Sequence, residues 1–362
     1  MAEDSVNEAL LREIPASEIL DKIQKGEPVE YDHIRIIGEL DLWELNLPTE
    51  HVDRTEFQTK ILELPEKSRV VSSSITITNS EFDANVNFGN NLFGGSNFIF
   101  ENTTFRGDAD FRAATFSEYV DFSRSTFSGM AYFNGGTFSG EAYFNGTTFS
   151  GYANFKWATF RRHAYFDGAA FSGEAYFSGA TFGEDGSFSG SKFEGEVLTF
   201  RDTTFILAKS QEGACRRAKN VLEKNGNREE AGYHFYREMD AKRKQKPWYI
   251  RYPEYVFIQL IFGYGVHPFR LLFCWFFVAV IFALIYSVNG GIIGKLPASS
   301  LPQPWSYFVE CFYFSVVTAV TPGYGKYELT SWVYQVIASA EAIFGTFMWA
   351  AFIATFARKY MR

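Results

Sequence analysis

A series of regularly spaced phenylalanines constrains the fold of this chain more than any other feature. Between Phe100 and Phe193 the gaps alternate between five and six residues, so the repeating unit has eleven residues. An α-helix would place neighbouring members of such a series on opposite faces, and a straight strand would require strict alternation. A chain that turns a corner every five or six residues instead directs every ring toward the centre of a coil. The series consists of Phe100, Phe105, Phe111, Phe116, Phe122, Phe127, Phe133, Phe138, Phe144, Phe149, Phe155, Phe160, Phe166, Phe171, Phe177, Phe182, Phe188 and Phe193.

The residues around each ring suit a four-sided coil. A small residue, such as Ala131, Ala142 or Ala153, precedes most of these phenylalanines by two positions and leaves room for the ring. Glycine, serine and asparagine between the phenylalanines suit the corners. Two eleven-residue units would form one coil, and stacked coils lie roughly 4.8 Å apart. We therefore expect residues 77–205 to form a rod about 25–30 Å long.

This section resembles the pentapeptide-repeat family, in the variant with a central phenylalanine and an eleven-residue period. A representative copy runs from Ala142 to Tyr152. The resemblance implies a right-handed quadrilateral β-helix, and it says little about function because such folds serve many roles. We assign residues 71–205 to this β-helix. Residues 1–70 are expected to form a cap, since a solenoid must cover its terminal coil.

The expected cap combines helical and extended patterns. Residues 5–25 show a helical period that is interrupted near Pro15, and Ser17 and Glu18 suit the start of a second short helix. Alternation in 34–36 and 40–42 predicts short strands. The first residues are acidic and contain no apolar stretch, so we expect no secretory signal and a cytoplasmic N-terminal region.

Outward-facing tyrosines recur along the predicted rod. Tyr132 and Tyr176 share one face with Asn154, and Tyr143 and Tyr165 share the opposite face. They either form a stacking ladder that stabilises neighbouring coils or mark a contact with a protein partner. The chain has a net charge of −8, which disfavours nucleic acid as the partner.

Residues 206–250 change to a helical pattern and are expected to form an amphipathic hairpin that links two domains. Gly226 ends the first helix, and Asn227 can cap the second, with Glu230 three residues later. Ala231, Phe235 and Met239 would line one face of this second helix. A basic cluster follows, which suits either anionic lipid headgroups or the ordinary cytoplasmic bias of membrane proteins; it consists of Lys242, Arg243, Lys244, Lys246 and Arg251.

Residues 251–362 are expected to form an all-α membrane domain. An interfacial aromatic segment precedes a turn at Gly263–Gly265 and a first span at about 269–289. A short apolar helix at about 305–319 is too short to cross, and a second span follows at about 331–358. Basic residues flank the outer ends of the two spans, which predicts a multi-pass protein of the plasma membrane with both termini in the cytoplasm.

The stretch between the short helix and the second span resembles the selectivity filter of two-span potassium channels. It runs from Ser315 to Gly325 and ends in Thr-Pro-Gly-Tyr-Gly. The resemblance implies a homotetramer that passes monovalent cations, with ions such as K⁺ held by backbone oxygens and no other cofactor. Gly323 and Gly325 can adopt positive φ, as a filter with inward carbonyls requires. The implied filter residues are Thr321, Pro322, Gly323, Tyr324 and Gly325.

Two positions depart from the family pattern. Pro322 replaces an aliphatic residue and lacks an N–H group, and Lys326 replaces an aspartate at the outer mouth. Four lysines would repel cations, although four copies of Glu328 could offset them. A weakly selective or anion-passing pore is therefore an alternative to a selective cation channel.

Several residues around the filter are candidates for support and gating. We assign Thr318 and Glu341 to filter support; Glu341 would bond either the back of the filter or a hydroxyl of the pore helix. Gly345 suits either an inner-helix hinge or close helix packing. Met348, Phe352 and Phe356 are candidates for lining the inner mouth.

The residues that carry most enzyme chemistry form no recognisable pattern. The five histidines are scattered, and Cys215, Cys274 and Cys311 lack the spacing of a metal site. We therefore expect a non-enzyme without a bound metal. A non-conducting membrane scaffold that presents the rod to a partner competes with the channel hypothesis.

Overall fold

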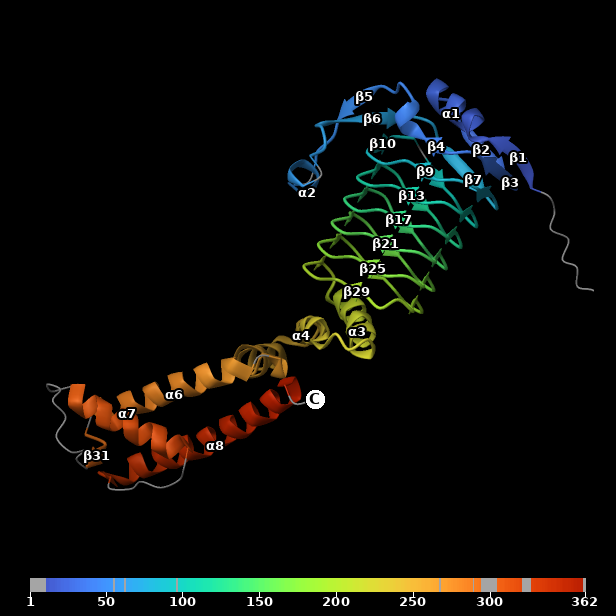
Figure 1. Ribbon diagram of the computed structural model, residues 1–362. Helices are drawn as coiled ribbons and strands as arrows, with labels where there is room; N and C mark the ends of the chain where they lie inside the picture. Colours follow the sequence, from blue (N-terminus) through green and yellow to red (C-terminus); the bar gives the residue numbers. More distant parts are fainter. Residues whose placement is uncertain are drawn as a thin grey trace, which may run out of the picture. The chain divides into compact units, whose positions relative to one another are not determined.

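The computed structural model describes residues 11–54, 56–61, 63–95, 97–266, 268–288, 290–293, 305–320 and 327–360. The chain divides into two compact units, Met1–Gln245 and Lys246–Arg362 (Figure 1). Each unit is described separately below.

The first unit is a four-sided β-solenoid whose coils visit four parallel sheets in the order A, C, D, B. Sheet A contains β1 (Arg12–Pro15), β3 (Ile34–Ile37), β8 (Glu81–Phe82), β12 (Thr104–Phe105), β16 (Thr126–Phe127), β20 (Thr148–Phe149), β24 (Ala170–Phe171) and β28 (Lys192–Phe193). Sheet C contains β4 (Leu40–Asp41), β9 (Val86–Asn87), β13 (Ala109–Asp110), β17 (Ala131–Tyr132), β21 (Ala153–Asn154), β25 (Ala175–Tyr176) and β29 (Leu198–Thr199).

The other two sides complete each coil. Sheet D contains β5 (Thr49–His51), β6 (Lys67–Val71), β10 (Asn91–Phe93), β14 (Thr115–Phe116), β18 (Thr137–Phe138), β22 (Thr159–Phe160), β26 (Thr181–Phe182) and β30 (Thr204–Phe205). Sheet B contains β2 (Val29–Asp32), β7 (Ile75–Thr78), β11 (Phe98–Ile99), β15 (Val120–Asp121), β19 (Ala142–Tyr143), β23 (Ala164–Tyr165) and β27 (Gly186–Ser187). The expected β-solenoid is confirmed.

The phenylalanines of the repeat form stacked columns inside the rod. Phe144 is fully buried, and its ring stacks on Phe122 at 5.4 Å and on Phe166 at 4.8 Å. Ala142 and Ala153 are also fully buried and face inward beside the rings. Each coil therefore fits one layer of rings onto the next, which explains why large and small residues alternate at the inward positions.

The tyrosines occupy opposite outer faces, as the period predicted. Tyr143 and Tyr165 stack on sheet B with ring centroids 5.3 Å apart. Beside sheet C, the ring of Tyr152, the residue before β21, lies between Tyr132 and Tyr176 in tilted contacts of 6.1 Å and 5.2 Å. The contacts on both faces join neighbouring coils, as the ladder interpretation predicted, although only the pair on sheet B is stacked.

The N-terminal region forms the first coil of the rod in addition to its cap. The helical pattern predicted up to Pro15 is wrong for β1, which pairs in parallel with β3. β2, β3 and β4 already form three sides of the first coil, so the solenoid begins well before residue 71. The end is covered by α1 (Ala16–Lys25), which buries Ile19, Leu20 and Ile23.

An arm between β4 and β6 replaces the fourth side of the first coil. It contains the 3₁₀ turn Leu42–Glu44, strand β5, which runs antiparallel to β6, and α2 (Glu56–Lys60). Phe57 stacks on Trp157 at 5.1 Å, and the Gln58 amide donates to the Gly135 carbonyl at 2.5 Å. The arm therefore reaches along the rod and contacts coils far from it in sequence.

A helical hairpin closes the other end of the solenoid. It consists of α3 (Ala208–Lys224) and α4 (Arg228–Lys244), and the Asn227 side chain accepts from the Glu230 N–H as predicted. The predicted buried face of α4 is wrong in part, because Phe235 and Met239 are only half-buried while His234 and Glu238 are buried. The hairpin is thus a polar end cap that belongs to the same compact unit as the rod.

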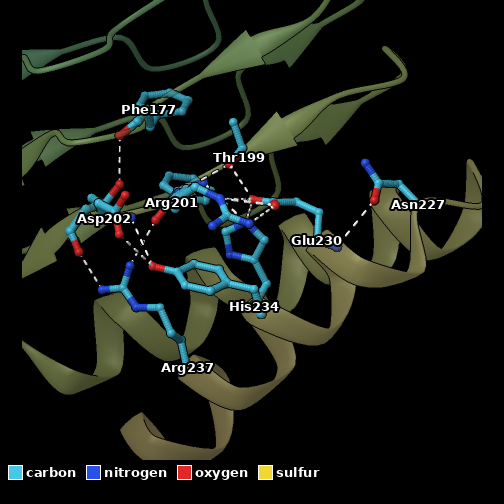
Figure 2. Close-up of polar contacts among 11 residues, drawn as sticks. Phe177, Thr199, Arg201, Asp202, Asn227, Glu230, His234 and Arg237 are labelled. Carbon is cyan, nitrogen blue, oxygen red and sulfur yellow. Dashed lines mark hydrogen bonds and ion pairs between the residues drawn. The ribbon is translucent and has the colours of Figure 1, made fainter. Parts of the chain in front are cut away.

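Side chains of α4 bond the open strand edge of the last coil (Figure 2). The Phe200 N–H donates to His234 Nε2 at 3.4 Å, and the Asp202 N–H donates to the Tyr233 hydroxyl at 3.0 Å. Arg237 Nη1 donates to the Phe200 carbonyl at 2.9 Å. These bonds satisfy backbone groups that a further coil would otherwise pair.

The same cap contains two groups with shifted pKa values. His234, with Nε2 3.6 Å from Glu230 Oε1, and Arg201 lower the pKa of Glu230 to about 2. Burial lowers the pKa of His234 below its ordinary 6.5, although Glu230 opposes the shift. Arg201 and Arg237 are the other charged groups that act on His234, and α3 contributes the uncharged Cys215 thiol beside Arg237.

We predict that the cap loosens in acid. The unfolded chain protonates His234 at a higher pH than the folded cap, so stability falls as the pH drops below 6.5. The contribution of Glu230 is present above 4.5 and is lost as the pH falls toward about 2. Hydrogen exchange of α4 amides in the full chain, corrected for intrinsic rates, should show lower protection at about pH 5 than at pH 7.

A non-titrating variant separates the two contributions. His234→Gln keeps an acceptor for the Phe200 N–H and should retain protection of α4 near pH 5, where Glu230 is still ionised. His163→Gln is the matched control, because His163 is partly exposed and pairs with Glu184 on the rod at 3.0 Å. Equal loss of protection in the wild type and in His234→Gln would show that His234 does not control the cap.

The second unit consists mainly of helices. They are α5 (Trp248–Glu254), a π-helix (Tyr255–Ile261), a 3₁₀ turn (Gly263–Gly265), α6 (Pro268–Val288), α7 (Trp305–Val320) and α8 (Trp332–Tyr360). Two short strands, β31 (Ile292–Ile293) and β32 (Glu328–Leu329), pair antiparallel. The first Gly-Tyr-Gly forms the turn before α6 that the sequence predicted, with Tyr264 at φ 52°.

Candidate functional site

Three apolar helices of the second unit pack against one another. α6 and α8 are long and apolar enough to cross a membrane, and α7 is a shorter apolar helix between them in sequence. The 16 residues of α7 span about 24 Å, less than the roughly 30 Å of a hydrocarbon core. α7 contacts both α6 and α8. It ends at Val320, directly before the Thr-Pro-Gly-Tyr-Gly sequence.

One face of α7 is buried against the two longer helices. This face includes Cys311, Phe314, Ser315, Thr318 and Ala319. The Phe314 ring packs edge-on against Tyr286 of α6 at 5.1 Å and against Tyr327 at 5.7 Å. Phe314 therefore holds α7 against α6 and against the segment that precedes α8.

A buried acid joins the three helices. Glu341 of α8 is 1% exposed. The Tyr286 hydroxyl of α6 donates to Glu341 Oε2 at 2.7 Å, and the Ser315 hydroxyl of α7 bonds Oε1. Ser315 Oγ also lies 2.9 Å from the Ala279 carbonyl of α6. Of the two sequence alternatives for Glu341, the contact with a pore-helix hydroxyl is present among the described residues.

Gly345, one turn after Glu341, packs directly on the end of α7. A Cβ at Gly345 would lie 2.6 Å from the Ala319 Cα and closer still to the Ala319 carbonyl oxygen. Real Cβ atoms do not approach backbone so closely, so only glycine allows α8 and α7 to meet here. This contact supports the packing role for Gly345.

The other predicted site residues differ in whether the structure describes them and in how exposed they are. Thr321–Gly325 and Lys326 lie outside the described residues. Thr318 is buried on α7, and Glu328 is exposed at the start of β32. Met348 is 1% exposed and packs inside one chain, which argues against its predicted place at the inner mouth. Phe352 is half-buried and Phe356 is exposed, so both remain candidates for the mouth.

Two residues of this site, Tyr286 and Ser315, did not enter the sequence prediction as partners. An acid inside a membrane span requires hydrogen-bond partners. The apolar helices contain many hydroxyls, so the sequence does not single out these two.

The basic residues in the last turn of α4 are paired with neighbouring acids. Lys242 pairs with Glu238, and Arg243 and Lys244 pair with Asp240, each at 2.7 Å. The prediction of lipid contact is wrong for Arg243, whose side chain is buried. In the second unit, Lys246 pairs with Glu254 at 2.6 Å.

Known families match both the repeat region and the helical region of the chain. A model of pentapeptide repeats (9 copies) matches residues 92–137, 111–159 and 158–204. A model described as ion channel matches residues 270–362, which include α6, α7 and α8. Residues 270–362 are therefore similar to ion channels of the potassium-channel-like class, a family that implies an oligomeric channel in a membrane. The chain joins pentapeptide repeats to an ion-channel domain, in that order. Searches of curated proteins and of solved structures gave no match.

Proposed function

We propose that the protein is a homotetrameric channel that conducts monovalent cations through residues 321–325. One chain supplies a quarter of the filter, so four copies are required to surround a dehydrated ion with carbonyl oxygens. The rod is cytoplasmic and has a regulatory or scaffolding role in this proposal. Its outward tyrosines are the candidate surface for a protein partner.

The observation that carries this proposal is the position of α7. A helix too short to cross is packed against two spans and ends one residue before Thr-Pro-Gly-Tyr-Gly. Irregular backbone at membrane depth is stable only inside protein or beside water, which is the environment of a filter.

The orientation follows from charge and aromatic residues. Basic residues lie before α6 and at the end of α8, which favours a cytoplasmic location for both ends. Trp248, Tyr252 and Phe257 in the segment before α6 are exposed, with Trp248 at 80%. Such side chains suit the headgroup region of the plasma membrane, where they and Arg251 would contact lipid.

The filter sequence argues for cation conduction with modest selectivity. Pro322 retains the carbonyl that binds ions but cannot donate an N–H behind the filter. Lys326 places positive charge at the outer mouth, and the nearby exposed carboxylate of Glu328 reduces that charge.

Restoring the family residues should increase selectivity. Pro322→Val combined with Lys326→Asp is expected to raise the K⁺/Na⁺ permeability ratio by about tenfold, because it restores a backbone donor and attracts cations. Reversal potentials of purified protein in liposomes under K⁺, Na⁺ and Cl⁻ gradients measure this ratio. Lys326→Arg is the matched control, since it keeps the charge and should leave the ratio unchanged.

Two other outcomes would identify the alternatives. A reversal potential that follows the Cl⁻ gradient would assign an anion pore, for which Lys326 is the motivating residue. Protein that passes no ion at any tested pH, voltage or calcium concentration would support the non-conducting scaffold instead.

A further inference from the structure

The oxygen atoms around Glu341 make more close contacts than there are protons to bridge them if Glu341 is ionised. Three oxygen pairs are within bonding distance, namely Tyr286 with Oε2, Oε1 with Ser315, and Ser315 with the Ala279 carbonyl. Each pair needs one proton. With Glu341 ionised, only the two hydroxyl protons are present, and one pair of oxygens would face each other without a hydrogen.

A proton on Glu341 completes the set. The carboxyl then donates to Ser315 Oγ, Ser315 donates to the Ala279 carbonyl, and Tyr286 donates to the other carboxyl oxygen. Three protons serve three contacts, and each hydroxyl has one acceptor.

The surroundings also disfavour a charge. Glu341 is almost fully buried, and among the described residues no lysine, arginine or histidine lies within ion-pair distance of it. Burying an unpaired carboxylate is far more costly than burying a hydrogen-bonded neutral acid.

We propose that Glu341 is a neutral hydrogen-bond bridge that positions the pore helix. Through Tyr286 and Ser315 it fixes α7 to both spans, and Gly345 holds the end of α7 one turn further along α8. All three side chains are positioning residues, because they act on the filter through α7. The effect on conduction rests on the proposed channel function, whereas the protonation does not.

Infrared spectroscopy of the full-length protein in lipid tests the protonation. At neutral pH the spectrum of the wild type should contain the carbonyl stretch of a buried protonated carboxyl, and Glu341→Gln should lack it. Glu310→Gln is the matched control, because Glu310 is the other acid of these helices and its removal should leave the band in place. A wild-type spectrum without a band that depends on Glu341 would overturn the proposal.

Flux and selectivity test the positioning. Glu341→Gln keeps one donor and one acceptor in the bridge, so its K⁺ flux and K⁺/Na⁺ ratio should remain within about twofold of the wild type. Glu341→Ala leaves two buried hydroxyls without their partner and should lower both by about tenfold. Ser315→Ala and Tyr286→Phe should shift the ratio in the same direction, whereas Ser287→Ala, which removes an exposed hydroxyl bonded within α6, should not.

The possible outcomes separate the two proposals. Loss of flux in Glu341→Gln as severe as in Glu341→Ala would show that the negative charge is needed and would overturn the neutral bridge. A wild type that conducts no ions but retains the infrared band would remove the channel function and leave the protonated bridge intact.

Discussion

Replacing Gly345 with alanine is expected to reduce ion flux to the level of protein-free liposomes. The added methyl group would lie 2.6 Å from the Ala319 Cα, and the obstacle is backbone, which cannot rotate away. α8 must then separate from the end of α7, immediately before the filter. Flux of the reconstituted protein measures the effect, and size-exclusion chromatography in detergent shows whether the oligomer still forms.

A double variant distinguishes packing from a hinge at this position. Adding Ala342→Gly to Gly345→Ala restores backbone flexibility one turn earlier in α8 but leaves the methyl group in place. If Gly345 acts through packing, the double variant stays inactive. Recovery of flux would favour the hinge and contradict the packing role.

Phe144→Ala is expected to destabilise the rod by about 3–5 kcal/mol, because it opens a cavity in a stack that has rings on both sides. Loss of one layer also interrupts the column between neighbouring coils. Denaturant unfolding of the full chain in detergent, followed by the circular dichroism of the β-structure, measures the change.

The neighbouring residue provides the control. Tyr143→Ala removes an aromatic ring of similar size from the outer face, where it stacks on Tyr165, and should cost only about 1 kcal/mol. Equal effects of the two substitutions would contradict the assignment of the inner column as the main source of stability.

The rod was predictable from sequence because its period is local and strict. Each phenylalanine marks a position that points into the rod, and the five or six residues before the next phenylalanine must contain a corner. An extra residue is absorbed at a corner, as where Ala175 pairs with Leu198, and Phe200 still stacks on Phe177 at 4.9 Å. Single insertions therefore disturb the sequence pattern more than the structure.

The two ends of the rod were less predictable because they depend on contacts that are distant in sequence. β1 follows an apparently helical pattern, but pairing with β3 determines its conformation. In α4 the hydrophobic pattern pointed to Phe235 and Met239, whereas the exposed strand edge required the polar groups of His234 and Arg237. Tertiary hydrogen bonding thus outweighed helical amphipathicity.

In the second unit, too, local features were predictable and contacts between distant residues were not. Its helices were predictable from length and hydropathy, and Glu341 was conspicuous as a lone acid in an apolar span. Its partners were not, because Tyr286 and Ser315 lie 55 and 26 residues away in sequence. The burial of Met348 was not predictable either, because sequence alone does not show which side of α8 packs inside the chain.

The regular coil has a consequence for how such a chain can change in length. Parallel pairing joins residues one full coil apart, such as Thr115 with Thr137 and Ala142 with Ala164. Deletion or duplication of one such interval would shorten or lengthen the rod by about 4.8 Å and return every outer face to its original side. A change of half that interval would preserve the inward rings but turn the distal part of the rod by half a revolution. Repeat duplication or deletion can therefore change the rod only in discrete steps. Whole coils change the distance between its ends alone, and half coils also turn one end relative to the other.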